Sequence, residues 1–173
     1  MSIVLYDIYF HFKAAKSVDI IGINRYFSWY QDTGHLELIQ QQMEEKILGW
    51  RERYPDKPLL ITEYGGDTIA GMHTLPSFVF TEEYQYDLMK NHFKAFDTSR
   101  VRGGFIGEMI WNFADFMTKQ GISRVVGNKK GIFTRQRQPK AAAHLLRRRY
   151  WHLAEVVDSF KTIKSDGVDN LFC

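Results

Sequence analysis

Three short apolar runs, each followed by a segment with helical periodicity, constrain the fold of this 173-residue chain more than any other feature. The runs span residues 18–24, 58–63 and 104–111. Each run is too apolar for a strand with one face in water, which is typical of a parallel sheet whose crossovers are helices. The sequence therefore predicts an α/β fold with parallel strands.

The segments between the runs predict the helices of this fold. Apolar residues recur at three- and four-residue steps over residues 36–54, which indicates a helix that Pro55 ends. Thr81 is predicted to cap a second helix that runs to about Phe96, because two glutamates follow it in the first turn. A third helix is expected to begin at Pro139.

The number of strand–helix units indicates part of a barrel. Three units are too few to close a barrel of eight, which typically needs about 250 residues, and an open sheet would leave bare edges. The sequence therefore predicts an incomplete (β/α)8 TIM barrel, its C-terminal portion, over residues 18–157. Residues 1–17 are interpreted as the remnant of a preceding barrel segment, a helix, and residues 158–173 as a polar C-terminal tail that frays.

Charge and composition argue against several classes of partner. The chain has 20 acidic and 23 basic residues and no long basic stripe, so no nucleic-acid partner is expected. No stretch reaches the roughly 18 apolar residues of a membrane span, and residues 1–7 lack the basic region of a signal peptide. The lone cysteine, Cys173, allows no intramolecular disulfide. The histidines show no metal-binding spacing, so no metal is expected.

Glu63 is the first candidate for chemistry. It ends the second apolar run, and two glycines that permit a sharp turn follow one residue later. In parallel α/β folds the carboxyl ends of strands carry catalytic groups, and a carboxylate there can cleave a sugar as nucleophile or acid/base. A glutamate at a strand end is by itself more often a solvated edge residue, so the assignment needs further segments.

Four segments together supply the missing specificity. They are Asn-Arg-Tyr-Phe-Ser-Trp-Tyr at 24–30, Ile-Thr-Glu-Tyr-Gly at 61–65, Trp-Asn-Phe-Ala-Asp-Phe at 111–116 and Gly-Asn-Lys-Lys-Gly-Ile-Phe-Thr-Arg at 127–135. In their order and spacing the chain resembles the β-glucuronidases, in family two of the glycoside hydrolases, from about Val18 to about Leu153. The resemblance implies about strands six to eight of the barrel and retaining hydrolysis of terminal β-D-glucuronides without metal or cofactor. It also implies a lysosomal enzyme that is a homotetramer at full length.

The resemblance assigns roles to individual residues. Glu63 matches the catalytic nucleophile, and Tyr26 matches a tyrosine that orients it, since a phenol can donate a hydrogen bond to a carboxylate. Asn128 and Lys130 match the pair that binds the carboxylate of the sugar, a charge that a neutral hexose lacks. The other residues expected to bind substrate are Tyr30, Trp111 and Arg124.

Simpler explanations exist for several of these residues. From the residues alone, Tyr26 is also a loop aromatic, residues 128–130 a solvated turn, and Trp111 an aromatic of the barrel core. Glu108 is expected to point into the barrel as a structural partner, and Asp115 to cap a turn.

One expected residue has no counterpart in this sequence. The general acid/base of the family is a glutamate in an Asn-Glu-Pro motif, which the chain does not contain. A retaining glycosidase needs two carboxylates about 5 Å apart, and loss of the placed acid typically lowers the rate by about 10²–10⁴-fold. Whether the isolated chain is active therefore stays open. Two alternatives also stay open, namely a noncatalytic sugar-acid binding or interaction module and a hydrolase for a galactoside or mannoside.

Overall fold

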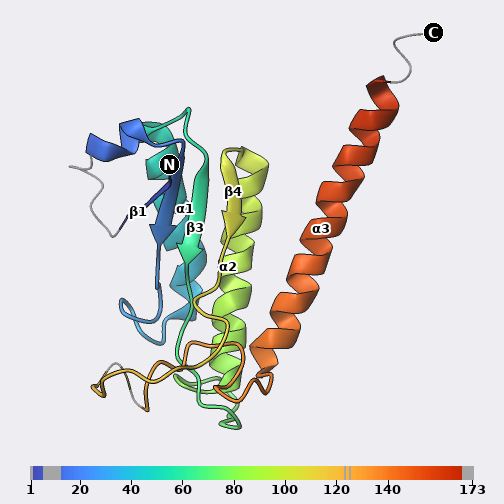
Figure 1. Ribbon diagram of the computed structural model, residues 1–173. Helices are drawn as coiled ribbons and strands as arrows, with labels where there is room; N and C mark the ends of the chain where they lie inside the picture. Colours follow the sequence, from blue (N-terminus) through green and yellow to red (C-terminus); the bar gives the residue numbers. More distant parts are fainter. Residues whose placement is uncertain (1, 6–12, 123, 125, 169–173) are drawn as a thin grey trace.

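Four parallel strands form one sheet in the order β1-β2-β3-β4, and helices accompany it (Figure 1). This computed structural model describes residues 2–5, 13–122, 124 and 126–168, and every statement below concerns those residues. The elements are β1 (Ser2–Leu5), η1 (Lys13–Ser17), β2 (Ile20–Asn24), η2 (Leu36–Leu38), α1 (Ile39–Arg53), β3 (Leu59–Glu63), α2 (Glu82–Arg102), β4 (Phe105–Glu108) and α3 (Ala141–Val168). The predicted α/β class with parallel strands is confirmed.

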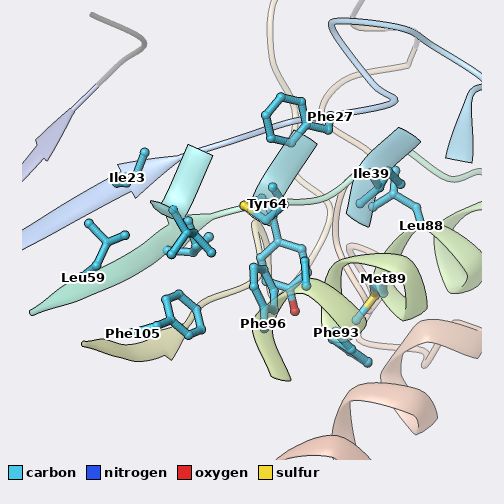
Figure 2. Close-up of a cluster of buried hydrophobic side chains, with 14 of the residues drawn as sticks. Ile23, Phe27, Ile39, Leu59, Tyr64, Leu88, Met89, Phe93, Phe96 and Phe105 are labelled. Atoms are coloured by element: carbon cyan, nitrogen blue, oxygen red, sulfur yellow. The ribbon is translucent and has the colours of Figure 1, made fainter. Parts of the chain in front are cut away.

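The hydrophobic core lies between the sheet and the helices α1 and α2. Strand residues Ile23, Leu59 and Phe105 face Phe96 of α2 and its neighbours (Figure 2). The rings of Phe96 and Phe105 stack with their centroids 5.4 Å apart. Side chains from α1 complete this layer, among them Ile39, Met43, Ile47 and Trp50. Burial of these apolar side chains is the main force that holds the strand ends, and hence the loops that follow them, in place.

The N-terminal segment differs from its prediction. Ser2–Leu5 is a strand that pairs in parallel with β2, so the interpretation of residues 1–17 as a helical remnant is wrong for these four residues. Residues 6–12 lie outside the described part of the chain. The short run at the N-terminus lacks the turn residues and the length that identify a strand in sequence.

Helices α2 and α3 extend further than their apolar patterns predict. Thr81 caps α2 as expected, and its side-chain oxygen accepts a hydrogen bond from the backbone N–H of Tyr84. The helix passes the predicted end at Phe96 and continues to Arg102, where Gly103 follows with a φ of +84°. α3 begins two residues after Pro139, and it extends as a helix into the predicted tail. Figure 1 shows the C-terminal part of α3 standing apart from the sheet.

A register shift in β4 changes which face its residues occupy. Leu59 pairs with Phe105 and Leu60 with Gly107, so Ile106 is an extra residue on β4. Such a bulge breaks the strict alternation of faces along a strand. Phe105 and Glu108, three residues apart, are consequently both buried.

Glu108 does not point into the barrel, as the sequence analysis expects, but toward the helices. Its carboxylate accepts hydrogen bonds from Arg100 on α2 (2.7 Å) and from Arg149 on α3 (2.9 Å). Arg149 also binds Asp97 at 2.6 Å, so that the cluster joins β4, α2 and α3. The expected direction of Glu108 is wrong because of the bulge at Ile106, which cannot be predicted from the pattern of residue types.

The loops that follow β2, β3 and β4 gather at the end of the sheet to which the strands point (Figure 1). This is the end at which parallel α/β folds carry their sites. No helix in the described part of the chain is long and apolar enough to cross a membrane.

Candidate active site

Glu63 and Tyr26 form the centre of the candidate site. Glu63 is the last residue of β3, and Tyr26 follows the end of β2. The two strand ends are aligned because a register shift pairs Asn24 with Glu63, and the N–H of Arg25 donates to the carbonyl of Glu63 at 2.8 Å. The Tyr26 hydroxyl donates to Oε2 of Glu63 at 2.6 Å. A short bond of this kind fixes the orientation of the carboxylate.

The turn after Glu63 brings Trp111 to the same place. The N–H of Trp111 donates to the carbonyl of Tyr64 at 2.9 Å. A Cβ on Gly65 would lie 2.4 Å from the backbone oxygen of Trp111, so only glycine allows the two segments to approach this closely. Trp111 is partly exposed, and its ring meets that of Phe116 edge-on. An indole face is thus available beside the end of β3.

Lys130 is fully buried within a group of aromatic rings. Its ammonium nitrogen lies 5.7 Å from the ring centroid of Tyr26, 5.0 Å from that of Trp29 and 4.9 Å from that of Tyr30. It also donates to Oδ2 of Asp67 at 2.6 Å. Of the three rings, that of Tyr30 is the most exposed, at 49%.

Arg124 lies at the outer side of the same cluster. Its guanidinium carbon is 5.7 Å from the ring centroid of Tyr30, and Nη1 is 3.7 Å from Oδ2 of Asp67. Two cations, Arg124 and Lys130, thus surround one buried carboxylate, that of Asp67. The three groups together carry one net positive charge.

Asn128 is buried in the loop that carries Lys130. Its Oδ1 accepts a hydrogen bond from the backbone N–H of Lys130 at 3.1 Å, and its backbone pairs with that of Phe116. The amide oxygen is thus occupied within the loop, and the NH₂ group of the same amide can donate a hydrogen bond to an anion.

The expected site residues lie at one end of the molecule. Lys130 lies over the ring of Tyr26, and the hydroxyl of that ring binds Glu63. Tyr30 and Arg124 belong to the same cluster, and Asn128 fixes the backbone of Lys130. The structure thus brings the nucleophile candidate to the hydroxyl of Tyr26 and the lysine candidate over the ring of the same tyrosine.

Two charged residues that no sequence motif singles out, Asp67 and Lys140, also support the site. The Lys140 ammonium, just before α3, donates to the carbonyls of Thr68 (2.8 Å) and Lys129 (2.9 Å) and to Oδ1 of Asp115 (2.9 Å). Burial lowers the pKa of this ammonium, and the bond to Asp115 opposes that effect. Lys140 therefore ties the loop after β3 to the loop after β4.

Asp115 acts differently from its expected role as a turn cap. It is 4% exposed, and its Oδ1 accepts hydrogen bonds from the N–H of Gly131, 16 residues further along the chain, and from the ammonium of Lys140, 25 residues further along. It joins distant segments and does not close a local turn.

Other parts of the described chain offer no competing centre of the expected chemistry. Residues 2–5, 13–122, 124 and 126–168 contain no group of three or more His, Cys, Asp or Glu that could hold a metal ion. An apolar groove of about 570 Å³ lies between the segment after β4 and α3, and Glu63 is not among the residues that line it. In the described part of the chain, the carboxylate–phenol pair and the lysine cluster are therefore the candidate site for the expected chemistry.

Several known proteins are similar to this chain over most of its length. Residues 6–155 match the family "Glycosyl hydrolases family 2, TIM barrel domain". The β-glucuronidase of Homo sapiens is 56% identical over 142 residues, which are 82% of this chain and 22% of that protein. The β-glucuronidase of Paenibacillus borealis is 52% identical over 143 residues, 83% of this chain and 23% of that protein.

Solved structures give the same result. The β-D-glucuronidase structure for Dictyoglomus thermophilum superimposes with a TM-score of 0.80 at 49% identity and covers 86% of this chain and 25% of that one. A Bifidobacterium dentium β-glucuronidase complexed with coumarin-3-O-glucuronide gives a TM-score of 0.77 at 42% identity, over 86% of this chain and 23% of that one. The chain thus spans about a quarter of the length of the relatives that it matches.

Proposed function

The chain belongs to family 2 of the glycosyl hydrolases, in the TIM barrel domain, and from this premise we propose that it provides the nucleophile and the uronate site for hydrolysis of terminal β-D-glucuronides. One observation carries the proposal. The carboxylate of Glu63 and the ammonium of Lys130 flank the same tyrosine, Tyr26. A sugar acid bound there has a nucleophile on one side and a cation on the other.

Glu63 acts as the nucleophile of a retaining mechanism. Its carboxylate oxygen attacks the anomeric carbon, the bond to the aglycone oxygen breaks, and a glycosyl ester forms that water then hydrolyses. The Tyr26 hydroxyl holds the carboxylate in a fixed orientation until the bond forms. The leaving oxygen takes a proton in the same step unless it departs as a stable anion.

The sugar carboxylate binds to the lysine cluster. Lys130 and Arg124 supply positive charge, the NH₂ of Asn128 supplies a neutral donor, and the Tyr30 hydroxyl supplies another. With Asp67 in place the cluster carries one net positive charge, which matches the single charge of a uronate. Trp111 supports the apolar face of the pyranose ring.

The lack of an Asn-Glu-Pro motif decides which substrates this chain can cleave by itself. Without a placed acid, cleavage of an ordinary glucuronide is slower by about 10²–10⁴-fold. Glucuronides whose leaving group needs no proton are exempt from this loss in the first step, although hydrolysis of the glycosyl ester then proceeds without the base that the same residue supplies. We therefore expect turnover by the chain with activated substrates.

A noncatalytic sugar-acid binding or interaction module is the second candidate. The missing motif favours it, and so does the open edge of the sheet at β4. Location in the lysosome and a homotetramer at full length remain predictions from the resemblance, as does the lack of any cofactor.

Turnover of an activated chromogenic β-D-glucuronide, 2,4-dinitrophenyl glucuronide, tests the proposal. The unaltered chain is expected to release the phenol, and Glu63→Gln to abolish release. Lys130→Ala should lower glucuronide cleavage far more than cleavage of the matching galactoside. Release that survives Glu63→Gln contradicts the nucleophile, and equal losses on the two sugars contradict the uronate site. Binding of D-glucuronate without turnover supports the noncatalytic module.

A further inference from the structure

Asp67 binds both a backbone group and a side chain of residues 129–130, the segment that carries the candidate uronate site. It lies four residues after Glu63 and is 2% exposed. Its Oδ1 accepts the backbone N–H of Lys129 at 2.5 Å, and its Oδ2 accepts from the ammonium of Lys130 at 2.6 Å. The next residue adds a further link, since the N–H of Thr68 donates to the carbonyl of Lys129 at 2.9 Å.

The burial of Lys130 makes a counter-charge necessary. Its side chain is fully inaccessible, and an ammonium taken out of water is strongly disfavoured unless it is paired. The rings of Tyr26, Trp29 and Tyr30 attract the cation but carry no net charge. The carboxylate of Asp67 is thus the group that neutralises the ammonium at this position.

The geometry of Asp67 also decides where the ammonium lies. Its two oxygens bind a backbone group and a side chain of adjacent residues, Lys129 and Lys130, so the lysine stem and its tip are fixed together. Arg124, 31% exposed and 3.7 Å from the same carboxylate, leaves the group with one positive charge in excess. A neutral residue in place of Asp67 would alter both the position and the charge.

We propose that Asp67 is a positioning residue that gives the site its preference for an acidic sugar by holding the ammonium of Lys130 beneath the Tyr30 ring. The inference rests on the proposed function, because it assumes that Lys130 meets the sugar carboxylate. Asp67 acts through Lys130 and does not touch the sugar.

The opposite role, in which Asp67 competes with the ligand for Lys130, makes a different prediction. Removal of its charge would then raise the affinity for a sugar acid, since the cluster would gain positive charge. The two roles are thus separated by the direction of a single change in affinity.

The test measures, by titration calorimetry on the full chain, the affinities of D-glucuronate and of D-glucuronamide, which has the same shape without the charge. Asp67→Asn is expected to lower the affinity for glucuronate by about tenfold or more and to change that for glucuronamide by less than about twofold. A purely structural role would lower both affinities alike. Asp67→Glu, which keeps the charge, should retain most of the preference for the acid.

The variant Lys130→Met shows which proposal fails, should one fail. In this background Asp67→Asn should no longer lower glucuronate affinity, because Asp67 acts through the lysine. A preference unaffected by Lys130→Met, or no binding by the unaltered chain, overturns the proposed function. Lys130→Met could lower the preference for glucuronate over glucuronamide while Asp67→Asn leaves that preference unchanged or raises it. This result overturns only the role of Asp67.

Folding of each variant is monitored by its thermal unfolding. If Asp67→Asn does not fold, Asp67→Glu and the double variant Asp67→Asn/Lys130→Met take over the comparison. If the preference of Asp67→Glu for glucuronate over glucuronamide falls to that of Lys130→Met, the inference is overturned. If Asp67→Glu retains the preference, the inference is supported.

Discussion

His92 should make the stability of the fold depend on pH between neutrality and about pH 4. It lies on α2 and is fully buried, with its ring 5.2 Å from that of Tyr64, the residue after the proposed nucleophile. Nδ1 lies 2.9 Å from the carbonyl of Leu88, to which it donates in the neutral ring. Burial lowers the pKa of this imidazole from 6.5 to about 4. The folded protein therefore holds His92 neutral.

The sign and size of the effect follow from that shift. Below pH 6.5 the unfolded chain binds a proton that the folded protein excludes, so stability is lost as the pH falls from 6.5 to about 4. One pKa unit corresponds to about 1.4 kcal/mol, which gives a full loss of about 3 kcal/mol and about 2 kcal/mol at pH 5.

Urea unfolding at pH 7 and pH 5, followed by tryptophan fluorescence, measures this loss. Other groups titrate too, so the quantity of interest is the difference between the unaltered chain and His92→Leu. We expect the unaltered chain to lose about 2 kcal/mol more than His92→Leu over this interval. His144→Leu, at an exposed histidine of α3, is the control and should lose as much as the unaltered chain. Equal losses in the unaltered chain and His92→Leu would refute the reasoning.

Two further predictions concern stability. Thr81→Ala removes the oxygen that accepts the N–H of Tyr84 and should lower the free energy of unfolding in urea by about 1 kcal/mol, whereas Thr81→Ser should lower it by less than about half as much. Glu108→Ala removes a carboxylate that is 1% exposed and paired with Arg149, so a loss of about 3 kcal/mol is expected in the same assay. Asp97→Ala, at the 55% exposed partner of that arginine, should cost less than about 1 kcal/mol, and a cost equal to that of Glu108→Ala contradicts the prediction.

Strands β2, β3 and β4 and the start of α2 could be predicted from local patterns. The apolar run that ends at Glu63 is observed as β3, and Thr81 caps α2 because a hydroxyl followed by acids favours a helix start in any context. The direction in which the Glu108 side chain points cannot be predicted from local sequence, since it depends on one extra residue in the pairing of β4 with β3. An alternating pattern contains no sign of such a shift.

The candidate site was predictable only through a resemblance that covers several segments. Tyr26 and Glu63 are 37 residues apart, and nothing in either segment alone shows that their side chains meet. Asp67 and Lys130 are 63 residues apart, and as a loop acid and a loop lysine both are typical of solvated surface. The burial of Lys130 follows from the rings of Tyr26, Trp29 and Tyr30, which the loop after β2 places around it.

Covalent labelling of the chain by a β-D-glucuronyl fluoride with a second fluorine at C2 tests the central claim most directly. Fluoride departs without a proton, and the fluorine at C2 slows hydrolysis of the glycosyl ester, so the intermediate accumulates. We predict that peptide mass analysis finds the sugar on Glu63, that Glu63→Gln prevents labelling, and that Lys130→Met slows it. A label on another carboxylate, or none on Glu63, would contradict the account.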